Sequence, residues 1–292
     1  MLQKKSRCKV NLLLNILGRR DDGFHELETL LHPVDVCDDL SFQKTAGARR
    51  PGVQFSCNEP RLSGPDNLVF RAATKFLDAA TISDGVKIHL EKRIPLAAGL
   101  GGGSSNAAIT LLALNELFGR PLPPARLADI AAALGSDVPF FLQDAPALAT
   151  GRGEKVSPLE NFAALKGAAF LLIHPGFGIS TAWAYQNLGR FPKAFRGTAG
   201  RAERLGRLLR TGGMKAARKE FYNSLESPAF EKFPVLQLYQ QFLLANGAEA
   251  ALMSGSGSTT FALAKSVPAA EALAEKFKGQ FGANGWTAVA AI

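Results

Sequence analysis

The segment Gly99-Leu100-Gly101-Gly102-Gly103-Ser104-Ser105-Asn106-Ala107-Ala108 decides how this sequence is interpreted. Its glycines allow positive φ angles and let a ligand approach the main chain without meeting a Cβ atom. A helix is expected over residues 105–118, and its first turn would present unpaired N–H groups and the positive end of the helix dipole. No acidic residue occurs in this helix before Glu116. The segment therefore predicts a phosphate-binding loop.

A simpler interpretation of the loop is a tight strand-to-helix connection with a serine cap. The density of glycines favours the phosphate-binding interpretation, although neither GxxxxGK[ST] nor GxGxxG occurs, so the loop must belong to another class. Ser104 and Ser105 can cap the helix, or they can bind phosphate and Mg²⁺. A second turn of small residues, Ser254–Thr260, is either a hairpin connection or a segment that closes over the same phosphates.

Hydrophobic periodicity indicates an α+β protein, with strands and helices alternating along the chain. In the first half we expect strands at 9–17, 24–36, 53–57 and 85–90 and helices at 67–80, 105–118 and 124–134. In the second half we expect strands at 168–174, 250–253, 260–263 and 288–292 and helices at 181–188, 200–210, 214–221 and 234–246. The boundary between the halves is expected near 150–165, which gives domains at 1–158 and 159–292.

Composition limits the possible classes of protein. The chain has 292 residues, and no apolar run approaches the ~18 residues of a membrane span. The N-terminal residues lead directly into a strand, so we expect a cytoplasmic protein without a targeting segment and without membrane contact. The cysteines (Cys8, Cys37, Cys57) are expected to be buried, reduced thiols, and the histidines (His25, His32, His89, His174) are too scattered to predict a metal site.

The formal net charge of +9 is compatible with nucleic acid or with an anionic small molecule. The densest basic segment, residues 190–218, is interpreted as a solvated helical face, because aromatic side chains do not alternate with its Lys and Arg residues as they would in a base-stacking surface. Charge alone therefore leaves the partner open.

Three segments, Lys9-Val10-Asn11, residues 99–108 and Ser254–Thr260, resemble the three signature motifs of the GHMP kinase superfamily. Further stretches resemble the branch that phosphorylates a small alcohol linked to cytidine diphosphate. These stretches are Gly18-Arg19-Arg20-Asp21-Asp22-Gly23-Phe24-His25-Glu26-Leu27, Gly64-Pro65-Asp66-Asn67-Leu68, Leu134-Gly135-Ser136-Asp137-Val138-Pro139-Phe140-Phe141, Gly151-Arg152-Gly153-Glu154 and Asn223-Ser224-Leu225-Glu226.

This resemblance implies a two-domain α+β fold. The N-terminal domain would be an ATP-binding domain like domain 2 of ribosomal protein S5, the C-terminal domain would be a ferredoxin-like α/β sandwich, and the active site would lie in the cleft between them. It also implies ATP and Mg²⁺ as cofactors and a cytidine diphosphate alcohol as the substrate. The protein would be a monomer or weak homodimer that binds no nucleic acid.

The resemblance also implies catalytic roles for Lys9 and Asp137, which match the lysine and aspartate that flank the acceptor hydroxyl in the family. A carboxylate close to the hydroxyl can accept its proton, and a neighbouring ammonium keeps that carboxylate ionised. Without the resemblance, Asp137 would be interpreted as a helix N-cap and Lys9 as a charge on an edge strand.

Other matching positions would bind the two ligands. The positions that match the ATP site are Pro95, Leu96, Ala97, Ala98, Gly99, Leu100, Gly101, Gly102, Gly103, Ser104, Ser105, Asn67, Leu68 and Lys92. The positions assigned to the substrate are Asn11, Phe24, His25, Thr181, Tyr185, Gly255 and Ser256. Phe24 and Tyr185 match base-stacking positions and His25 matches a base-reading one. Alone, Phe24 and Leu68 would be interpreted as core residues and His25 as a turn residue.

The sequence departs from the family pattern at three places. Arg7-Cys8 replaces Pro-Ala, Ala97 replaces a common glycine, and Phe24 replaces a common tyrosine. None of these changes removes a charged group, so we expect an active enzyme. The alternatives are another GHMP kinase of the mevalonate or homoserine type, and a non-catalytic RNA-binding protein. The combination of Lys9 and Asp137 argues against the RNA-binding alternative.

Overall fold

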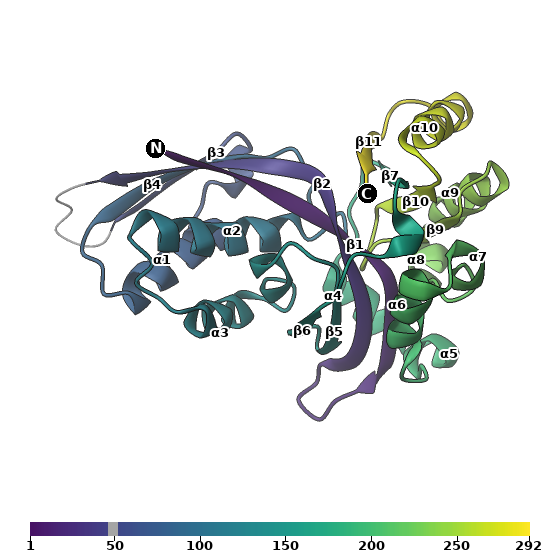
Figure 1. The fold of residues 1–292 in the computed structure, drawn as a ribbon, viewed down its shortest axis with the longest axis horizontal. Coiled ribbons are helices and arrows are strands. Elements are labelled where there is room, and N and C mark those ends of the chain that lie inside the picture. The colour runs from purple at the N-terminus through teal and green to yellow at the C-terminus, as the bar shows by residue number, and fades with distance from the viewer. Residues whose placement is uncertain (46–51) are drawn as a thin grey trace. The chain divides into compact units, whose positions relative to one another are not determined.

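The computed structural model describes residues 1–45 and 52–292, which form two compact units (Figure 1). Unit 1 comprises Met1–Cys8, Cys37–Ile94 and Gly101–Asp144, and unit 2 comprises Lys9–Val36, Pro95–Leu100 and Ala145–Ile292. Two long strands, β1 (Leu2–Arg19) and β2 (His25–Thr45), contribute residues to both units. The compact units thus cut across the sequence, and the domain division at 158/159 stays a prediction.

Unit 1 combines a small sheet with three helices. Strand β4 (Gly85–Glu91) pairs in parallel with β3 (Val53–Cys57) and antiparallel with the second part of β2. The helices are α1 (Leu68–Ala79), α2 (Gly102–Leu117) and α3 (Pro124–Leu134), followed by the 3₁₀ helix η2 (Pro139–Leu142); another short 3₁₀ helix is η1 (Pro60–Leu62). Each helix packs against the other two.

Helix α1 illustrates why these segments are helical. Its buried residues are Val69, Ala72, Ala73, Phe76 and Leu77, which recur at the i, i+3, i+4 spacing of one helix face. The side chain of Asn67 accepts a hydrogen bond from the Val69 N–H at 2.8 Å and so caps the first turn. The predicted helix at 67–80 is thereby confirmed.

Unit 2 contains an antiparallel sheet in the order β11 (Trp286–Ala291), β7 (Ala169–His174), β10 (Thr260–Ala264) and β9 (Ala250–Met253). Strand β7 is buried along its whole length. Helices α9 (Pro234–Ala245) and α10 (Val267–Phe281) pack on this sheet and complete a core with Leu171, Leu243 and Phe277.

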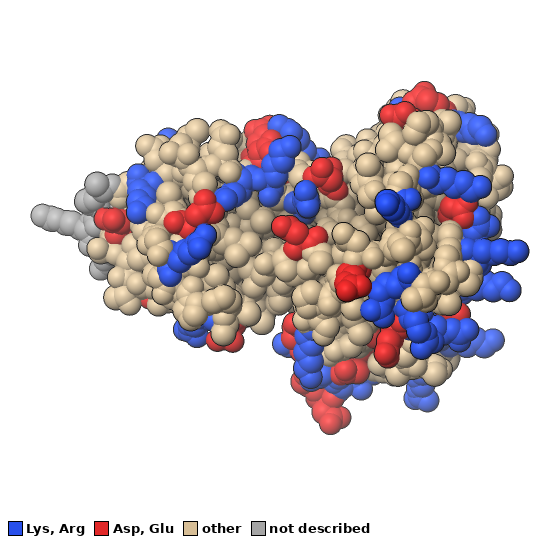
Figure 2. Space-filling model, viewed as in Figure 1, with Lys and Arg blue, Asp and Glu red and all other residues tan. Residues whose placement is uncertain are grey.

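The first part of β2 pairs with β5 (Ala147–Gly151), which pairs with β6 (Lys155–Pro158), while β1 pairs in parallel with β8 (Tyr222–Asn223). The remaining helices of unit 2 are η3 (Ala163–Leu165), α4 (Thr181–Leu188), α5 (Pro192–Phe195), α6 (Arg201–Thr211), α7 (Met214–Ala217) and α8 (Glu226–Lys232). On the face shown in Figure 2, many Lys and Arg residues gather over the helical part of this unit.

Most predicted elements are confirmed, and the differences have physical causes. The sequence prediction missed α5, α8, α10, β5, β6 and β8, it began β1 too late, and it ended β2 too early. Polar residues such as Asp38 interrupt the apolar pattern of these strands, although hydrogen bonds satisfy Asp38 inside the fold. The helix predicted at 214–221 ends at Ala217, and Arg218 instead forms an ion pair with Glu249.

None of the helices in the described part of the chain is long and apolar enough to span a membrane. Cys8, Cys37 and Cys57 are free thiols; Cys8 is buried as expected, whereas Cys37 and Cys57 are partly exposed.

The carboxyl of Glu226 links α8 to strand β9 in unit 2. Its Oε1 atom accepts hydrogen bonds from the Met253 N–H at 2.8 Å and from Gln240 Nε2 at 3.1 Å. Burial raises the pKa of Glu226 to about 7, against the opposing effect of these two hydrogen bonds. An acid with a higher pKa in the folded state binds more protons when folded, so its contribution to stability is lost as the pH rises from 4.5 through 7.

We therefore expect the substitution Glu226→Gln to remove this loss of stability at high pH, because glutamine does not ionise. Its side-chain oxygen can still accept both hydrogen bonds. The difference in free energy of unfolding between E226Q and the wild type should grow with pH, in favour of E226Q, to on the order of 3 kcal/mol above pH 7. Urea unfolding between pH 4.5 and 8 measures it. Glu275→Gln, which changes an exposed carboxyl on α10, is the control. A difference that does not vary with pH would contradict the prediction.

Candidate functional site

The ammonium group of Lys9 lies inside unit 2, although lysine is usually exposed. The residue is only 3% exposed, and its Nζ atom donates to Asn11 Oδ1 at 2.7 Å and to the Gly99 carbonyl at 2.9 Å. Asn11 in turn donates to Thr29 Oγ1 at 2.9 Å, and Thr29 donates to the Leu13 carbonyl at 2.6 Å. The interpretation of Lys9 as a solvated surface charge is therefore wrong, and the expectation that Lys9 and Asn11 share one strand face is confirmed.

The two glycine-containing turns found in the sequence meet beside Lys9. The Ser254 hydroxyl donates to the Gly99 carbonyl at 3.0 Å, and the Thr259 N–H donates to the Ala98 carbonyl at 3.1 Å. A Cβ atom added at Gly99 would lie 1.9 Å from the Ser254 carbonyl oxygen. At Gly255, an added Cβ atom would lie 3.2 Å from Lys9 Nζ. The absence of side chains at these positions is what allows the turns to touch.

Asn223 fixes the second turn from the side of β8. Its Nδ2 atom donates to the carbonyls of Met253 at 2.7 Å and Gly255 at 2.8 Å. Its Oδ1 atom accepts from the Leu225 N–H at 2.9 Å. Because the main chain of Asn223 pairs in register with Leu14 of β1, this one residue connects the second turn to the strand that carries Lys9.

Several of the predicted substrate residues lie close to one another in unit 2. The hydroxyls of Thr181 and Ser256 are 2.9 Å apart and hydrogen-bonded. The rings of His25 and Tyr185 have centroids 5.0 Å apart, and Phe195, which the sequence analysis did not predict, lies edge-on to His25 at 5.7 Å. Burial and the nearby positive charge of Arg19 lower the pKa of His25, so its imidazole is neutral at pH 7.

Phe24 has a different environment from the other aromatic residues. The residue is 53% exposed, and the guanidinium of Arg152 lies over its ring at 4.6 Å from the centroid. The core interpretation of Phe24 is therefore wrong. Arg152 holds this place from the turn after β5, where the Glu154 carboxylate accepts a hydrogen bond from the Arg152 N–H at 2.6 Å.

Residues assigned to the nucleotide lie close together in unit 1. Lys92 and Leu68 both lie next to the start of α2. A Cβ atom added at Gly102 would lie 2.9 Å from Lys92 Nζ, and a Cβ atom added at Gly103 would lie 3.7 Å from Leu68 Cδ1. Leu68 begins α1, which Asn67 caps. The residue before α2, Gly101, has a φ of 69° and no side chain caps the helix, so the serine-cap interpretation is wrong.

The remainder of the predicted loop, Pro95–Leu100, belongs to unit 2 and continues in sequence into Gly101. Within it, Ala97 has a φ of 50°, in the left-handed region that favours glycine. The departure noted in the sequence, alanine in place of glycine, thus falls on a position with backbone strain.

Asp137 lies in unit 1, in the turn between α3 and η2, and is partly exposed. The residue at the N-cap of η2 is Val138, and no side chain caps η2. The N-cap interpretation of Asp137 is therefore not what the structure shows. Its pairing with Lys9 across the acceptor hydroxyl stays a prediction.

Ser104 and Ser105, the candidate ligands for Mg²⁺, differ in their environments. Ser105 is buried and its hydroxyl accepts a hydrogen bond from Ser6 at 2.7 Å, whereas Ser104 is partly exposed. Of these two, Ser104 is the one that a metal could reach. Within residues 1–45 and 52–292, no cluster of three His, Cys, Asp or Glu side chains suited to a metal ion is found.

Comparisons with known proteins agree with this geometry. A model of the GHMP kinases N terminal domain matches residues 67–145, and one of the GHMP kinases C terminal domain matches residues 193–283. The 4-diphosphocytidyl-2-C-methyl-D-erythritol kinase of Geobacter sulfurreducens is 39% identical over 290 residues, which cover 99% of this chain and 98% of the relative. The enzyme of the same name from Syntrophus aciditrophicus is 42% identical over 266 residues, or 90% of each chain.

The chain belongs to the GHMP kinase family. A crystal structure of a 4-(cytidine 5'-diphospho)-2C-methyl-D-erythritol kinase covers 100% of both chains with a TM-score of 0.82 and 36% identity. The two-domain α+β GHMP kinase fold inferred from the three motifs is thus confirmed.

Sequence reasoning missed several residues that organise this GHMP kinase. Asn223 and Glu226 were noted as part of a family-like stretch, but no role could be given to them because their partners, Met253 and Gly255, are distant in sequence. Asp38, which contacts Lys92, was not singled out at all. The available signal was alternation along the strand, which places Asp38 on the same face as the apolar Leu40 and Phe42, where an acid is rarely buried without partners.

Two nearby positions of the loop should differ in their sensitivity to substitution. Gly99→Ala introduces a Cβ atom 1.9 Å from the Ser254 carbonyl at a φ of 75°, and we expect a loss of at least about 2 kcal/mol of stability together with most activity. Ala97→Gly relieves the positive φ and should leave stability within about 1 kcal/mol of the wild type. Thermal unfolding and steady-state kinetics measure both. A stable, active G99A enzyme would show that the two turns do not need their close contact.

Proposed function

We propose that this GHMP kinase transfers the γ-phosphoryl group of ATP to the 2-hydroxyl of 4-diphosphocytidyl-2-C-methyl-D-erythritol, which gives the 2-phosphate and ADP. The observation that carries this proposal is the identity of 39% over 99% of the chain to a relative of that name. The buried Lys9–Asn11–Gly99 cluster supports it, because phosphoryl transfer depends on fixed positive charge and on exact positioning. Such an enzyme acts in the biosynthesis of isoprenoid precursors.

In the proposed reaction, the alcohol oxygen forms a bond to the γ-phosphorus while the bond from that phosphorus to the bridging oxygen of ADP breaks. The proton of the hydroxyl passes to the carboxylate of Asp137, which acts as the base. Lys9, held by Asn11 and the Gly99 carbonyl, supplies positive charge next to the reacting oxygens. The rigid hydrogen bonds of Lys9 keep this charge in place before the substrate binds.

The cytosine ring is proposed to bind against the aromatic residues of unit 2. Phe24 and Tyr185 would stack on the base, and the neutral imidazole of His25 offers one donor and one acceptor for its polar edge. Stacking tolerates any base, so discrimination would come from the hydrogen bonds of His25. The Thr181–Ser256 pair and Gly255 would contact the alcohol or its phosphates.

ATP is proposed to bind at residues 95–105 with Asn67, Leu68 and Lys92 around its adenine. The α2 terminus offers N–H groups without an acidic residue in its first turn, which suits a polyphosphate. When bound, Mg²⁺ would neutralise charge on the phosphates, which themselves supply most of its ligands, with Ser104 as the fitting protein ligand. We propose that the enzyme works in the cytoplasm as a monomer or weak homodimer.

The base assignment predicts a specific kinetic defect. Asp137→Ala should lower kcat by at least about 10²-fold, because the hydroxyl proton loses its acceptor, while ATP affinity and thermal stability stay close to the wild type. Steady-state kinetics and calorimetric ATP titration measure these quantities. Asp129→Ala, which removes a carboxylate from the surface of α3 (70% exposed side chain), is the matched control. Full turnover by D137A would refute the role of this carboxylate.

A substrate panel tests the identity of the alcohol. We expect rapid ADP release with 4-diphosphocytidyl-2-C-methyl-D-erythritol, and at least about 10³-fold lower kcat/KM with mevalonate or homoserine, which have no base to bind His25. The uridine analogue should also be poor. Preferential turnover of mevalonate or homoserine would favour the alternative GHMP kinases, and salt-sensitive RNA binding without ATP turnover would favour the RNA-binding alternative.

A further inference from the structure

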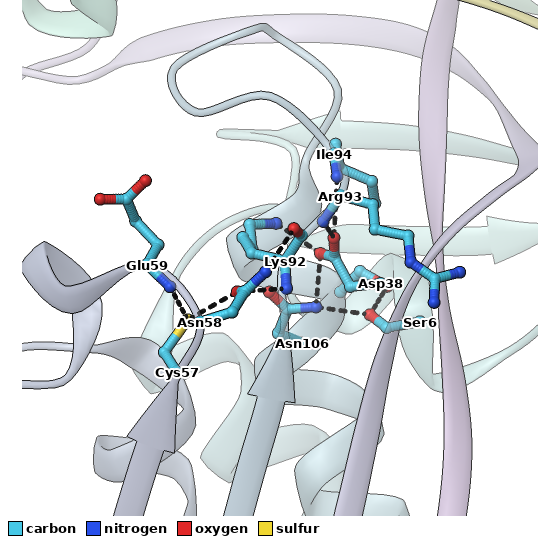
Figure 3. A network of polar contacts seen from close by, with 10 residues as sticks. Ser6, Asp38, Cys57, Asn58, Glu59, Lys92, Arg93, Ile94 and Asn106 are labelled. Carbon is cyan, nitrogen blue, oxygen red and sulfur yellow. Dashed lines mark hydrogen bonds and ion pairs between the residues drawn. The ribbon is translucent and has the colours of Figure 1, made fainter.

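The carboxylate of Asp38 is the centre of a buried polar network in unit 1 (Figure 3). The residue is 0% exposed. Its Oδ1 atom accepts hydrogen bonds from the N–H groups of Arg93 at 2.7 Å and Ile94 at 2.9 Å. Its Oδ2 atom accepts from Asn106 Nδ2 at 2.9 Å and forms an ion pair with the ammonium of Lys92. Each carboxylate oxygen thus has two partners.

The network places the ammonium of Lys92 at the start of α2. A Cβ atom added at Gly102, the first residue of α2, would lie 2.9 Å from Lys92 Nζ, and the Lys92 side chain is only 7% exposed. The main chain of Lys92 is held from its other side by Asn58, whose Oδ1 atom accepts from the Lys92 N–H at 2.8 Å. The side chain therefore cannot swing to solvent without breaking its contact with Asp38.

The first turn of α2 is part of the same network. Asn106 Nδ2 also donates to Ser6 Oγ at 2.9 Å, and the Ser6 hydroxyl donates to Ser105 Oγ at 2.7 Å. Strand β1, the end of β4 and the helix start are thereby connected through Asp38 and Asn106, as Figure 3 shows. This turn of α2 is the part of unit 1 to which the sequence assigns the phosphates of ATP.

Stability alone does not account for a buried ion pair at this place. Replacing a buried pair by neutral groups of similar shape is often neutral or stabilising, because the two charges cost free energy to remove from water. An ammonium at a helix N-terminus also opposes the positive end of the dipole. The negative charge of Asp38 offsets that repulsion at the helix start.

We propose that Asp38 is a positioning residue for ATP: it holds the ammonium of Lys92 and the Lys92–Ile94 main chain at the start of α2 in the arrangement that the nucleotide requires. The inference rests on the proposed function, since it assigns the start of α2 to ATP. Asp38 acts through Lys92 and does not itself contact the nucleotide.

A double-mutant cycle in the full chain tests this proposal. Asp38→Asn keeps the Oδ1 acceptor for the Arg93 and Ile94 N–H groups but removes the charge, and Lys92→Met removes the ammonium while it keeps the length of the side chain. We expect D38N to raise KM for ATP about 10-fold or more, with KM for the alcohol within about twofold of the wild type. Because Asp38 acts through Lys92, adding D38N to K92M should change KM for ATP by less than about twofold.

The readouts separate positioning from a purely structural role. D38N alone leaves a buried ammonium without its carboxylate, so its thermal unfolding temperature should fall, and D38N/K92M should recover it because both charges are gone. KM for ATP should stay raised in D38N/K92M. Recovery of both stability and KM for ATP in the double variant would show that the network is only structural and would overturn the proposal, even if D38N fails to fold.

Asp39→Asn is the matched control, because Asp39 is the adjacent residue and its carboxylate forms an exposed ion pair with Arg93. It should leave KM for ATP unchanged, and an equal rise in D39N and D38N would overturn the proposal. Calorimetric titration of the wild type with an unreactive ATP analogue separates the two levels of inference. A wild type that does not bind the analogue would refute the proposed function, whereas normal binding by wild type and D38N alike would refute only the role of Asp38.

Discussion

The direct contact between the main chains of Gly99 and Ser254 is the constraint on which the arrangement of unit 2 depends. Because Gly99 has no side chain, the Ser254 main chain can approach it, and the Gly99 carbonyl accepts hydrogen bonds from both Lys9 and the Ser254 hydroxyl. Lysine is usually solvent-exposed, but Lys9 is held at 3% exposure beside the second glycine turn. Immobilising a charge before the ligands arrive avoids the cost of reorganising it during the reaction.

Asparagine side chains perform the same structural task in both units. In unit 2, Asn223 donates to two carbonyls of the second turn, and in unit 1, Asn106 donates to Asp38 and to Ser6. An amide carries two donors and an acceptor in one plane, so it can connect segments that are far apart in sequence without adding a buried charge. The buried charges of Lys9, Asp38 and Lys92 thus lie beside the proposed ligand sites, whereas these neutral amides make connections between segments.

Local requirements of the chain made part of this structure predictable from the sequence. Both glycine turns were found because close backbone approach demands glycine, and Lys9 and Asn11 were placed on one face because strand side chains alternate. Asp38 could not be assigned in this way, since its partners Lys92 and Asn106 are 54 and 68 residues away and only folding brings them together. Strand β2 was ended too early for the same reason: its buried acid looks like a surface residue until its donors are known.

The interleaving of the two units along the chain limits how this enzyme can be divided. Unit 2 takes Lys9 from the N-terminal strand, Gly99 from the middle of the chain and Ser254 from near the end. Any cut between residues 99 and 254 separates Ser254 from Lys9 and Gly99, so neither half expressed alone would retain the contact between the two glycine turns. If recombination replaced one half of the gene by that of a relative, the new half would still have to make the contacts that the retained half requires. This requirement favours inheritance of the chain as a whole.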